Sequence, residues 1–374
     1  MNHQRACVAA LAGLPAMTTH RLTSLLNGRA PSEAYAVATG QSTPDPMLAA
    51  LFARHPDLRR RWIDAAEDRH VDDVGARCDE LGVRVVLPPD DDYPQVLVDD
   101  PRRPAVLFVQ GELSAVDGRR VGIVGTRNPT KRGEQTASTF GHELSAAGVC
   151  IVSGLAKGVD GAAHRGALAA AGAPPVAVVA NGHDQPYPKR HAALWAEVAR
   201  CGAVVSEWPP GTPPDAFRFP QRNRILAALS EIVLVVESRE RGGSLITAQL
   251  AAERGIDVFA IPGPLDARAS LGTNQLLRDG AAIAADPDDL LLALGLDRRR
   301  AGNVRHDPRP RPVGAAANVL AFCAERPRDV IAVADRFRLE ITEAALVLAR
   351  LERDGWLHDT AGWFEVLESW AGLS

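Results

Sequence analysis

Basic side chains follow five apolar runs in the middle of this sequence, and each group of charges comes just after its run ends. Arginine and lysine bind phosphate oxygens, although any one exposed cation is usually a solvated surface charge. Five basic loops in series therefore favour an anion site, and an elongated row fits a polyanion better than a single phosphate. The residues concerned are Arg127, Lys131, Arg132, Lys157, Lys189, Arg190, Arg218, Arg222, Arg224, Arg239 and Arg241.

The same loops contain small, polar and aromatic residues that suit a nucleic acid. Glycines let backbone amides approach a phosphate closely, and hydroxyl or amide side chains add donors. Phe217 and Phe219 lie among arginines in FRFPQRNR, and aromatic rings beside cations let single-stranded nucleic acid stack its bases. We expect at least one of these rings to pack inward. The other residues concerned are Gly125, Gly154, Gly158, Gly182, Gly242, Gly243, Ser153, Asn223, Ser244 and Thr247.

The elements that would position these loops alternate regularly. The five runs VGIVGT, CIVSG, VAVVAN, AVVSE and IVLVVES are typical of strands buried on both faces, and helical patterns separate them. The pattern predicts an α/β fold, an extended Rossmann-like, doubly wound and mostly parallel sheet of roughly seven strands. Carboxyl ends of parallel strands meet at one edge, where the N-terminal ends of the following helices also face a ligand. After AVVSE we expect a long loop and then a helix from about Asn223.

Composition divides the chain into four predicted parts. Residues 1–75 predict a helical domain (SAM/HhH-like), in which LAGLPAMTTHRLTSLL has the shape of a helix–turn–helix. It could grip a DNA backbone, but we favour a packing module because the arginines at 54–61 lie away from the turn. Residues 76–296 form the core, 297–314 an Arg/Pro-rich linker, and 315–374 a winged-helix-like domain. Mixed charge on its last helix leaves DNA contact and protein docking both open.

Composition also limits the class of protein. The net charge of −4 over 374 residues means that any anion site must be local. Five scattered cysteines without a CxxC motif predict a reducing compartment, with neither a disulfide framework nor a metal cluster. We see no signal peptide and no apolar run long enough for a membrane span, so we expect a cytoplasmic protein without membrane contact.

Several catalytic interpretations have little support. GTRNPTKRG is not GxGxxG, and no GxxxxGK[ST] occurs, so neither a dinucleotide nor P-loop ATP hydrolysis is predicted. Glu207 and Glu237 end two strands and could act as an acid–base pair, although we favour roles in orienting a neighbouring arginine or capping the next helix. Asp160 and His164 could likewise pair, but we expect Asp160 to cap its helix and His164 to pack or hydrogen-bond beneath the loop.

The ordered blocks VGIVGTRNPTKRG, IVSGLAKGVDGAAHRGAL, YPKRHAAL, VVSEWPPG, FPQRNRILAALS, GGSLITAQLAAERG, VFAIPG and SLGTNQLLRDGA resemble the DNA-processing protein A (DprA/Smf) family. The resemblance runs from about residue 93 to residue 292. It implies a Rossmann core that binds single-stranded DNA without sequence preference and loads the recombinase RecA during natural transformation. It also implies a homodimer, no catalytic turnover and no cofactor.

Site residues are carried over by motif. Arg127 of GTR would hold a phosphate, with the 153–158 loop beside it. Two changes depart from the family: Gly242-Gly243-Ser244 stands where SGS is common, and Asn181 and His183 occupy a loop that usually has glycine. The whole predicted DNA site comprises Gly125, Arg127, Lys131, Ser153, Gly154, Lys157, Gly158, Lys189, Arg218, Phe219, Arg222, Asn223, Arg224, Gly243, Ser244 and Thr247.

An enzyme of another class remains as the alternative. Nucleoside-monophosphate phosphoribohydrolases have related Rossmann cores that carry PGGxGTxxE. The comparable stretch here is RGGSLITAQ, which places Ala248 and Gln249 where the catalytic glutamate would be expected. The missing carboxylate removes the general base and disfavours this interpretation. A transcription factor acting through the winged helix is a third possibility, which would leave the basic row unexplained.

Overall fold

The computed structural model describes residues 1–68, 70–296 and 312–366 of the chain. It contains two compact units, Met1–Asp297 and Arg298–Ser374. Most of the predicted linker, residues 297–311, lies outside the described residues. Over the part of the chain that is described, no helix is both long and apolar enough to cross a membrane.

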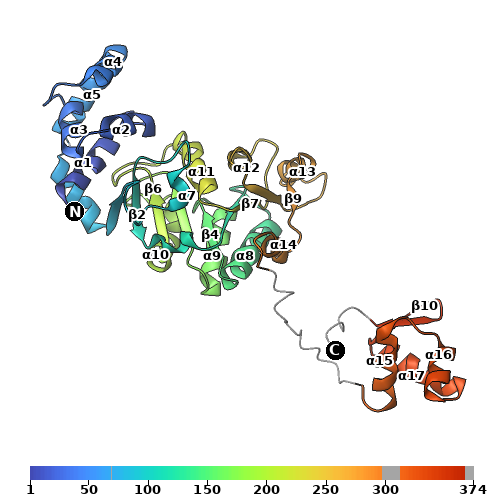
Figure 1. The fold of residues 1–374 in the computed structure, drawn as a ribbon. Helices are drawn as coiled ribbons and strands as arrows, with labels where there is room; N and C mark the ends of the chain where they lie inside the picture. The colour runs from blue at the N-terminus through green and yellow to red at the C-terminus, as the bar shows by residue number, and fades with distance from the viewer. Residues whose placement is uncertain (69, 297–311, 367–374) are drawn as a thin grey trace. The chain divides into compact units, whose positions relative to one another are not determined.

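A nine-stranded sheet forms the centre of the first unit (Figure 1). Its order is β1-β2-β6-β5-β4-β3-β7-β8-β9. Strands β3 to β9 run parallel, whereas β2 lies antiparallel to β6 and β1 antiparallel to β2. The predicted mostly parallel α/β sheet is therefore confirmed. The strands are β1 (Val83–Val86), β2 (Leu107–Gly111), β3 (Arg120–Val124), β4 (Cys150–Ser153), β5 (Val176–Val179), β6 (Ala203–Ser206), β7 (Ile232–Val235), β8 (Asp257–Ala260) and β9 (Ala282–Ile283).

Helices cover both faces of this sheet because its strands are apolar on both sides. On one face, Phe140 of α8 and Ala163 of α9 share a core with Ile123 and Ile151. On the other face, Leu226 of α11 and Ala248 of α12 pack with Val178 and its neighbours. The helices are α7 (Gln95–Val98), α8 (Lys131–Ala146), α9 (Val159–Ala170), α10 (Ala192–Cys201), α11 (Arg218–Ala228), α12 (Gly243–Ala252), α13 (Leu271–Arg278) and α14 (Pro287–Ala293), with two 3-10 turns at Leu113–Asp117 and Lys189–His191.

The chain reverses direction across the sheet between β3 and β7. It builds β3, β4, β5 and β6 outward on one side, then crosses back to place β7, β8 and β9 on the other. Loops that leave β3 and β7 consequently diverge to opposite faces, and such a switch point opens a crevice at the carboxyl ends of the strands. The five strands that carry the basic loops are consecutive neighbours in the order β6-β5-β4-β3-β7.

The N-terminal helices share a hydrophobic core with the antiparallel edge of the sheet. Trp62, Leu25 and Leu11 are buried in the same cluster as Val85 and Phe108 of β1 and β2. The stretch with the predicted helix–turn–helix shape contains the end of α1 and all of α2, and the predicted domain boundary near residue 75 falls inside α6. These helices are α1 (His3–Ala12), α2 (Thr19–Leu26), α3 (Pro31–Ala38), α4 (Pro46–Arg54), α5 (Pro56–Glu67) and α6 (Val71–Glu80).

The second unit contains three helices and one hairpin: α15 (Ala315–Glu325), α16 (Val330–Phe337), α17 (Ile341–Arg353), β10 (Leu357–Thr360) and β11 (Trp363–Val366). Ala361 and Gly362 both have positive φ, as a two-residue hairpin turn requires. Val319, Leu348 and Trp356 lie in its core. The likeness of this unit to a winged helix stays a prediction.

Candidate functional site

A cavity of about 580 Å³ opens at the carboxyl edge of the sheet, where the chain switches direction between β3 and β7. The loops after β3, β4, β5, β6 and β7 all contribute to its wall. Eight of the sixteen predicted site residues line it, namely Gly125, Arg127, Phe219, Arg222, Asn223, Gly243, Ser244 and Thr247. The basic side chains Arg239 and Arg241, which belong to the predicted basic row, line it as well.

Arg127 and two aromatic rings form one wall of the cavity. The guanidinium carbon of Arg127 lies over the Phe219 ring, 4.5 Å from its centroid. The Tyr187 ring lies 5.7 Å from the same ring in a tilted arrangement. Arg127 and Tyr187 are exposed, whereas Phe219 is half-buried. A planar cation and two rings side by side can bind a phosphate and stack a nucleobase at the same place.

Helix α11 brings Phe219 and Arg222 to the cavity, and it begins earlier than predicted. The expected start near Asn223 is wrong, because the helix runs from Arg218. Pro220 stands at the third position of the helix, and proline is tolerated in the first turn because no intrahelical N–H is required there. Phe219, Arg222 and Asn223 are spaced at i, i+3 and i+4, which places them on one face of the helix.

Arg222 is buried beneath the cavity, with 3% of its surface exposed. It donates a hydrogen bond to the carbonyl oxygen of Val178. Burial lowers the pKa of Arg222 to about 10, and Asp160 opposes this shift. Burial also raises the pKa of Asp160, while Arg222 counteracts that rise. Both side chains come so close to Gly154 that a Cβ there would fall nearer than 3.0 Å to each. A residue larger than glycine at position 154 would therefore collide with these side chains, and the Arg222 side chain forms the floor of the cavity.

The loop after β7 and the start of α12 form the opposite wall. Gly242 caps the helix with an extended backbone, and α12 begins at Gly243. Its first N–H groups have no intrahelical partners, which makes a helix start favourable for an anion. The Ser244 hydroxyl donates to the Ser238 hydroxyl at 2.9 Å, and the Asn223 amide lies 3.5 Å from the Gly243 carbonyl oxygen.

Eight predicted residues lie outside the cavity wall: Lys131, Ser153, Gly154, Lys157, Gly158, Lys189, Arg218 and Arg224. Ser153 is fully buried and donates to the carbonyl oxygen of Ile123 at 2.6 Å, so the predicted phosphate contact of its hydroxyl is wrong. Gly158 has a φ of +86°, and a Cβ there would meet the Thr126 carbonyl oxygen at 2.5 Å. Arg218 donates to Pro213 and covers the Phe217 ring. The three lysines are exposed around the edge.

Arg224 lines the opposite side of α11 and not this cavity, which corrects its predicted place in the DNA site. It forms an ion pair with Glu207 and donates to the Thr19 hydroxyl at 3.0 Å, on the side of the N-terminal helices. The expectation that Glu207 orients an arginine is confirmed. Glu237 accepts from the Thr130 N–H at 2.9 Å and from its hydroxyl at 2.6 Å, just before α8. Glu237 therefore holds the N-cap residue of α8. Its expected role in capping the next helix is wrong, because Gly242 is the N-cap of α12.

Tyr187 is the main site residue that the sequence prediction omits. The expectation that Asp160 caps α9 is wrong, because Gly158 is the N-cap of that helix and Asp160 lies in its first turn. Tyr187 stands two residues before Lys189 in a basic loop. An aromatic residue close to basic residues is the same signal that predicted Phe219. Asp160 reaches the floor because the cavity lies over the first turn of α9, where it accepts from the backbone of Ala156 and Gly154. His164, one turn later, is fully buried, and burial lowers its pKa to about 3.

Over the described part of the chain, the cavity wall offers no accessible carboxylate in place of the glutamate that the hydrolase alternative lacks. Ala248 is buried in the sheet core, and the exposed Gln249 donates to Glu253 at 3.1 Å. Asp160 is the single carboxylate among the residues described as lining the cavity, and it is 6% exposed beside a buried arginine. A general base needs access to a substrate proton, which this arrangement does not offer.

Comparison with known proteins gives consistent matches. The family model described as DNA recombination-mediator protein A matches residues 84–295. Protein Smf from Escherichia coli is 38% identical over 284 residues, covering 74% of this chain and 76% of the relative. DNA processing protein DprA from Bacillus subtilis is 40% identical over 212 residues, covering 56% of this chain and 71% of that protein.

Solved structures of two relatives illustrate the similarity in fold. DNA processing protein A from Streptococcus pneumoniae has a TM-score of 0.64 at 32% identity, covering 78% of this chain and 98% of that one. DNA processing protein A from Helicobacter pylori has a TM-score of 0.52 at 28% identity, covering 57% and 96%. The latter structure describes a single-stranded DNA binding mode of that protein.

Proposed function

The chain belongs to the DNA recombination-mediator protein A (DprA/Smf) family, and from that membership we propose that it binds single-stranded DNA without sequence preference. The proposal includes the loading of a RecA recombinase onto the bound strand during DNA uptake or recombination. It also includes a homodimer in the cytoplasm that turns over no substrate.

The observation that carries the proposal is the wall of the switch-point cavity, where Arg127 lies over Phe219 next to Tyr187. Stacking on aromatic rings works for every base, so this wall supports affinity without reading the sequence. Arg239, Arg241 and the start of α12 supply positive charge on the other side. Because the net charge of the chain is −4, the attraction for DNA comes from this group of cations at the sheet edge and not from the chain as a whole.

Binding can be tested by fluorescence anisotropy with labelled oligo-dT and the matching duplex at two salt concentrations. Arg127→Ala combined with Arg241→Ala removes two exposed cations of the cavity; the buried Arg222 is left intact so that the fold is preserved. Arg119→Ala is the control, since Arg119 adjoins the amino end of β3 and pairs with Glu231 at 2.8 Å. We expect salt-sensitive binding to the single strand that the double variant loses and the control retains. A preference for duplex, or binding that survives the double variant, would reject this site.

Recombinase loading needs a separate measurement, because strand binding does not require it. The lag before RecA begins strand-dependent ATP hydrolysis on strands coated with single-strand binding protein would be recorded with and without this protein. A shortened lag supports loading, and an unchanged lag limits the function to strand binding. Light scattering with size exclusion tests the homodimer.

A further inference from the structure

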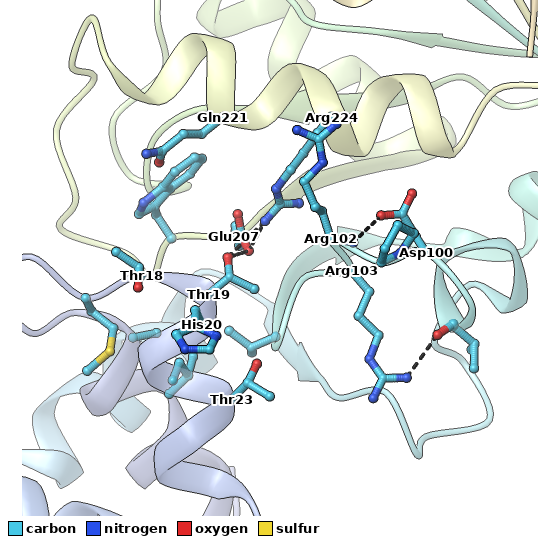
Figure 2. Close-up of a pocket in the computed structure, with 17 residues that line it drawn as sticks. Thr18, Thr19, His20, Thr23, Asp100, Arg102, Arg103, Glu207, Gln221 and Arg224 are labelled. Atoms are coloured by element: carbon cyan, nitrogen blue, oxygen red, sulfur yellow. Dashed lines mark hydrogen bonds and ion pairs between the residues drawn. The ribbon is translucent and has the colours of Figure 1, made fainter. Parts of the chain in front are cut away.

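A second cavity, of about 710 Å³, lies on the other side of α11, between the N-terminal helices and the sheet core (Figure 2). Thr18, Thr19, His20 and Thr23 face it from α2 and its cap, opposite Gln221 and Arg224 of α11. The loop before β2 supplies Arg102 and Arg103, and the loop after β6 supplies Glu207 and Trp208. The cavity has the size of a site for a small ligand or one nucleotide unit.

One helix separates the two cavities and contributes to both. Phe219, Arg222 and Asn223 face the switch-point cavity, whereas Gln221 and Arg224 face the second one. Gln221 is two residues from Phe219, and this spacing turns it through about 200° to the opposite side of the helix. A helix with its side chains is about 10 Å across, a distance that an extended strand of a few nucleotides can cross.

The second cavity combines donors, an aromatic ring and cations. Arg102 and Arg103 are exposed; Arg102 pairs with Glu253 at 2.9 Å and Arg103 donates to the Val98 carbonyl at 2.9 Å. Exposed interactions of this kind are weak, so a phosphate can replace the present partner of either arginine. Trp208 is half-buried in the wall and can take a base on its face.

The charged groups of the second cavity leave a hydrogen-bond donor that an acceptor atom of a ligand can satisfy. Glu207 is neutralised by Arg224, and Asp100 by Arg254 at 2.6 Å, so the acidic groups of the wall are both paired. Arg224 keeps one nitrogen, Nη1, buried without a hydrogen-bond partner among the described residues. A buried donor of this kind is costly unless something accepts from it.

We propose that this cavity is a second contact site for the strand held at the sheet edge, occupied by one nucleotide with its base against Trp208 and its phosphate at Arg102. The proposal rests on the proposed binding of single-stranded DNA and extends it. The path runs from Phe219 across Gln221 to the start of α2, so the N-terminal helices contribute to strand binding directly. A strand long enough to cross α11 uses both cavities, whereas a short one uses the sheet edge alone.

The test compares a short oligo-dT of roughly two nucleotides, which cannot cross α11, with a long one of roughly twenty. The variants are Arg102→Ala and Trp208→Ala in the full chain, each checked by its melting temperature. Arg119→Ala is a matched control because it too removes a half-exposed arginine that pairs with one glutamate, the side-chain exposures being 48% and 50%. Titration with dTMP alone distinguishes a free nucleotide from the strand.

We expect Trp208→Ala to weaken the long oligonucleotide by about tenfold, and Arg102→Ala to weaken it about fivefold with a smaller salt slope. Affinity for the short oligonucleotide should match that of Arg119→Ala. The proposal is overturned if both variants bind the long strand as the control does, or if both lengths weaken equally. Arg102-dependent binding of dTMP without an effect on the long strand also overturns it. Failure of the wild type to bind any single strand rejects the proposed function itself.

Discussion

The Arg127 guanidinium covers the Phe219 ring at 4.5 Å, so the exposed cation and the half-buried aromatic side chain of the candidate site act as one unit. Phe219 is fixed on α11 and Arg127 is carried by the loop after β3, and these elements meet only in the folded sheet. The contact orients the arginine in the free protein. It therefore reduces the ordering that a phosphate contact would otherwise require.

Arg127→Lys separates charge from planarity at this contact. Lysine retains the positive charge but not the flat stack on Phe219, so we expect a loss of about 0.5–1 kcal/mol in binding with an unchanged salt slope. Arg127→Ala should lose more affinity and reduce the salt slope by about 1. Anisotropy titrations of oligo-dT over several salt concentrations measure both quantities. Equal slopes for the lysine and alanine variants would show that Arg127 makes no phosphate contact.

Gly154→Ala should disturb the floor of the switch-point cavity. Its Cβ would fall closer than 3.0 Å to the guanidinium of Arg222 and to the carboxylate of Asp160, both of them buried. Overpacking of this kind costs about 1–3 kcal/mol of stability, and the displaced Arg222 should lower DNA affinity as well. Gly118→Ala is the control, since its Cβ would meet nothing closer than 3.9 Å. A Gly154→Ala protein that melts and binds like the control would show that Arg222 moves without cost.

Much of the sheet edge could be predicted because alternation and charge are local signals. Each β-branched run determines a strand, and the basic residues that follow it must then lie at one edge, as Arg127 and Arg241 do. What a single sequence cannot show is the direction of a side chain on its element. Ser153 and Arg224 were assigned to the site by motif, yet one points into the sheet core and the other to the N-terminal helices. Those directions depend on long-range partners, Ile123 and Thr19.

Glu237→Ala tests whether the strand-end carboxylate is structural or catalytic. Removing it leaves the Thr130 N–H and hydroxyl without their acceptor at the start of α8, which should cost about 1–2 kcal/mol of stability. DNA affinity should stay equal or rise, because a negative charge leaves the edge. Thermal melting and anisotropy measure the two effects. Glu240→Ala, which removes an exposed glutamate in the following loop, should leave the melting temperature unchanged.

Acid sensitivity of the core should depend on His164. Its pKa is about 3 in the folded protein against an ordinary 6.5, because burial disfavours the charged ring and nearby Arg222, His191 and Arg165 add repulsion. The unfolded chain therefore binds a proton that the folded one does not. The contribution of His164 to stability is complete above about pH 6.5 and is lost as the pH falls toward about 3.

Between about pH 6.5 and 5 this single group should lower the free energy of unfolding by about 2 kcal/mol. His183, with a pKa near 4, acts in the same direction, whereas the raised pKa of Asp160 acts in the opposite one. His164→Leu replaces a fully buried ring with an apolar side chain, so the variant should fold and lose about 2 kcal/mol of the acid sensitivity. The measurement is the difference in melting temperature between the two pH values. If the variant shows the full wild-type difference, the acid sensitivity arises from other groups, with His183 the next to replace.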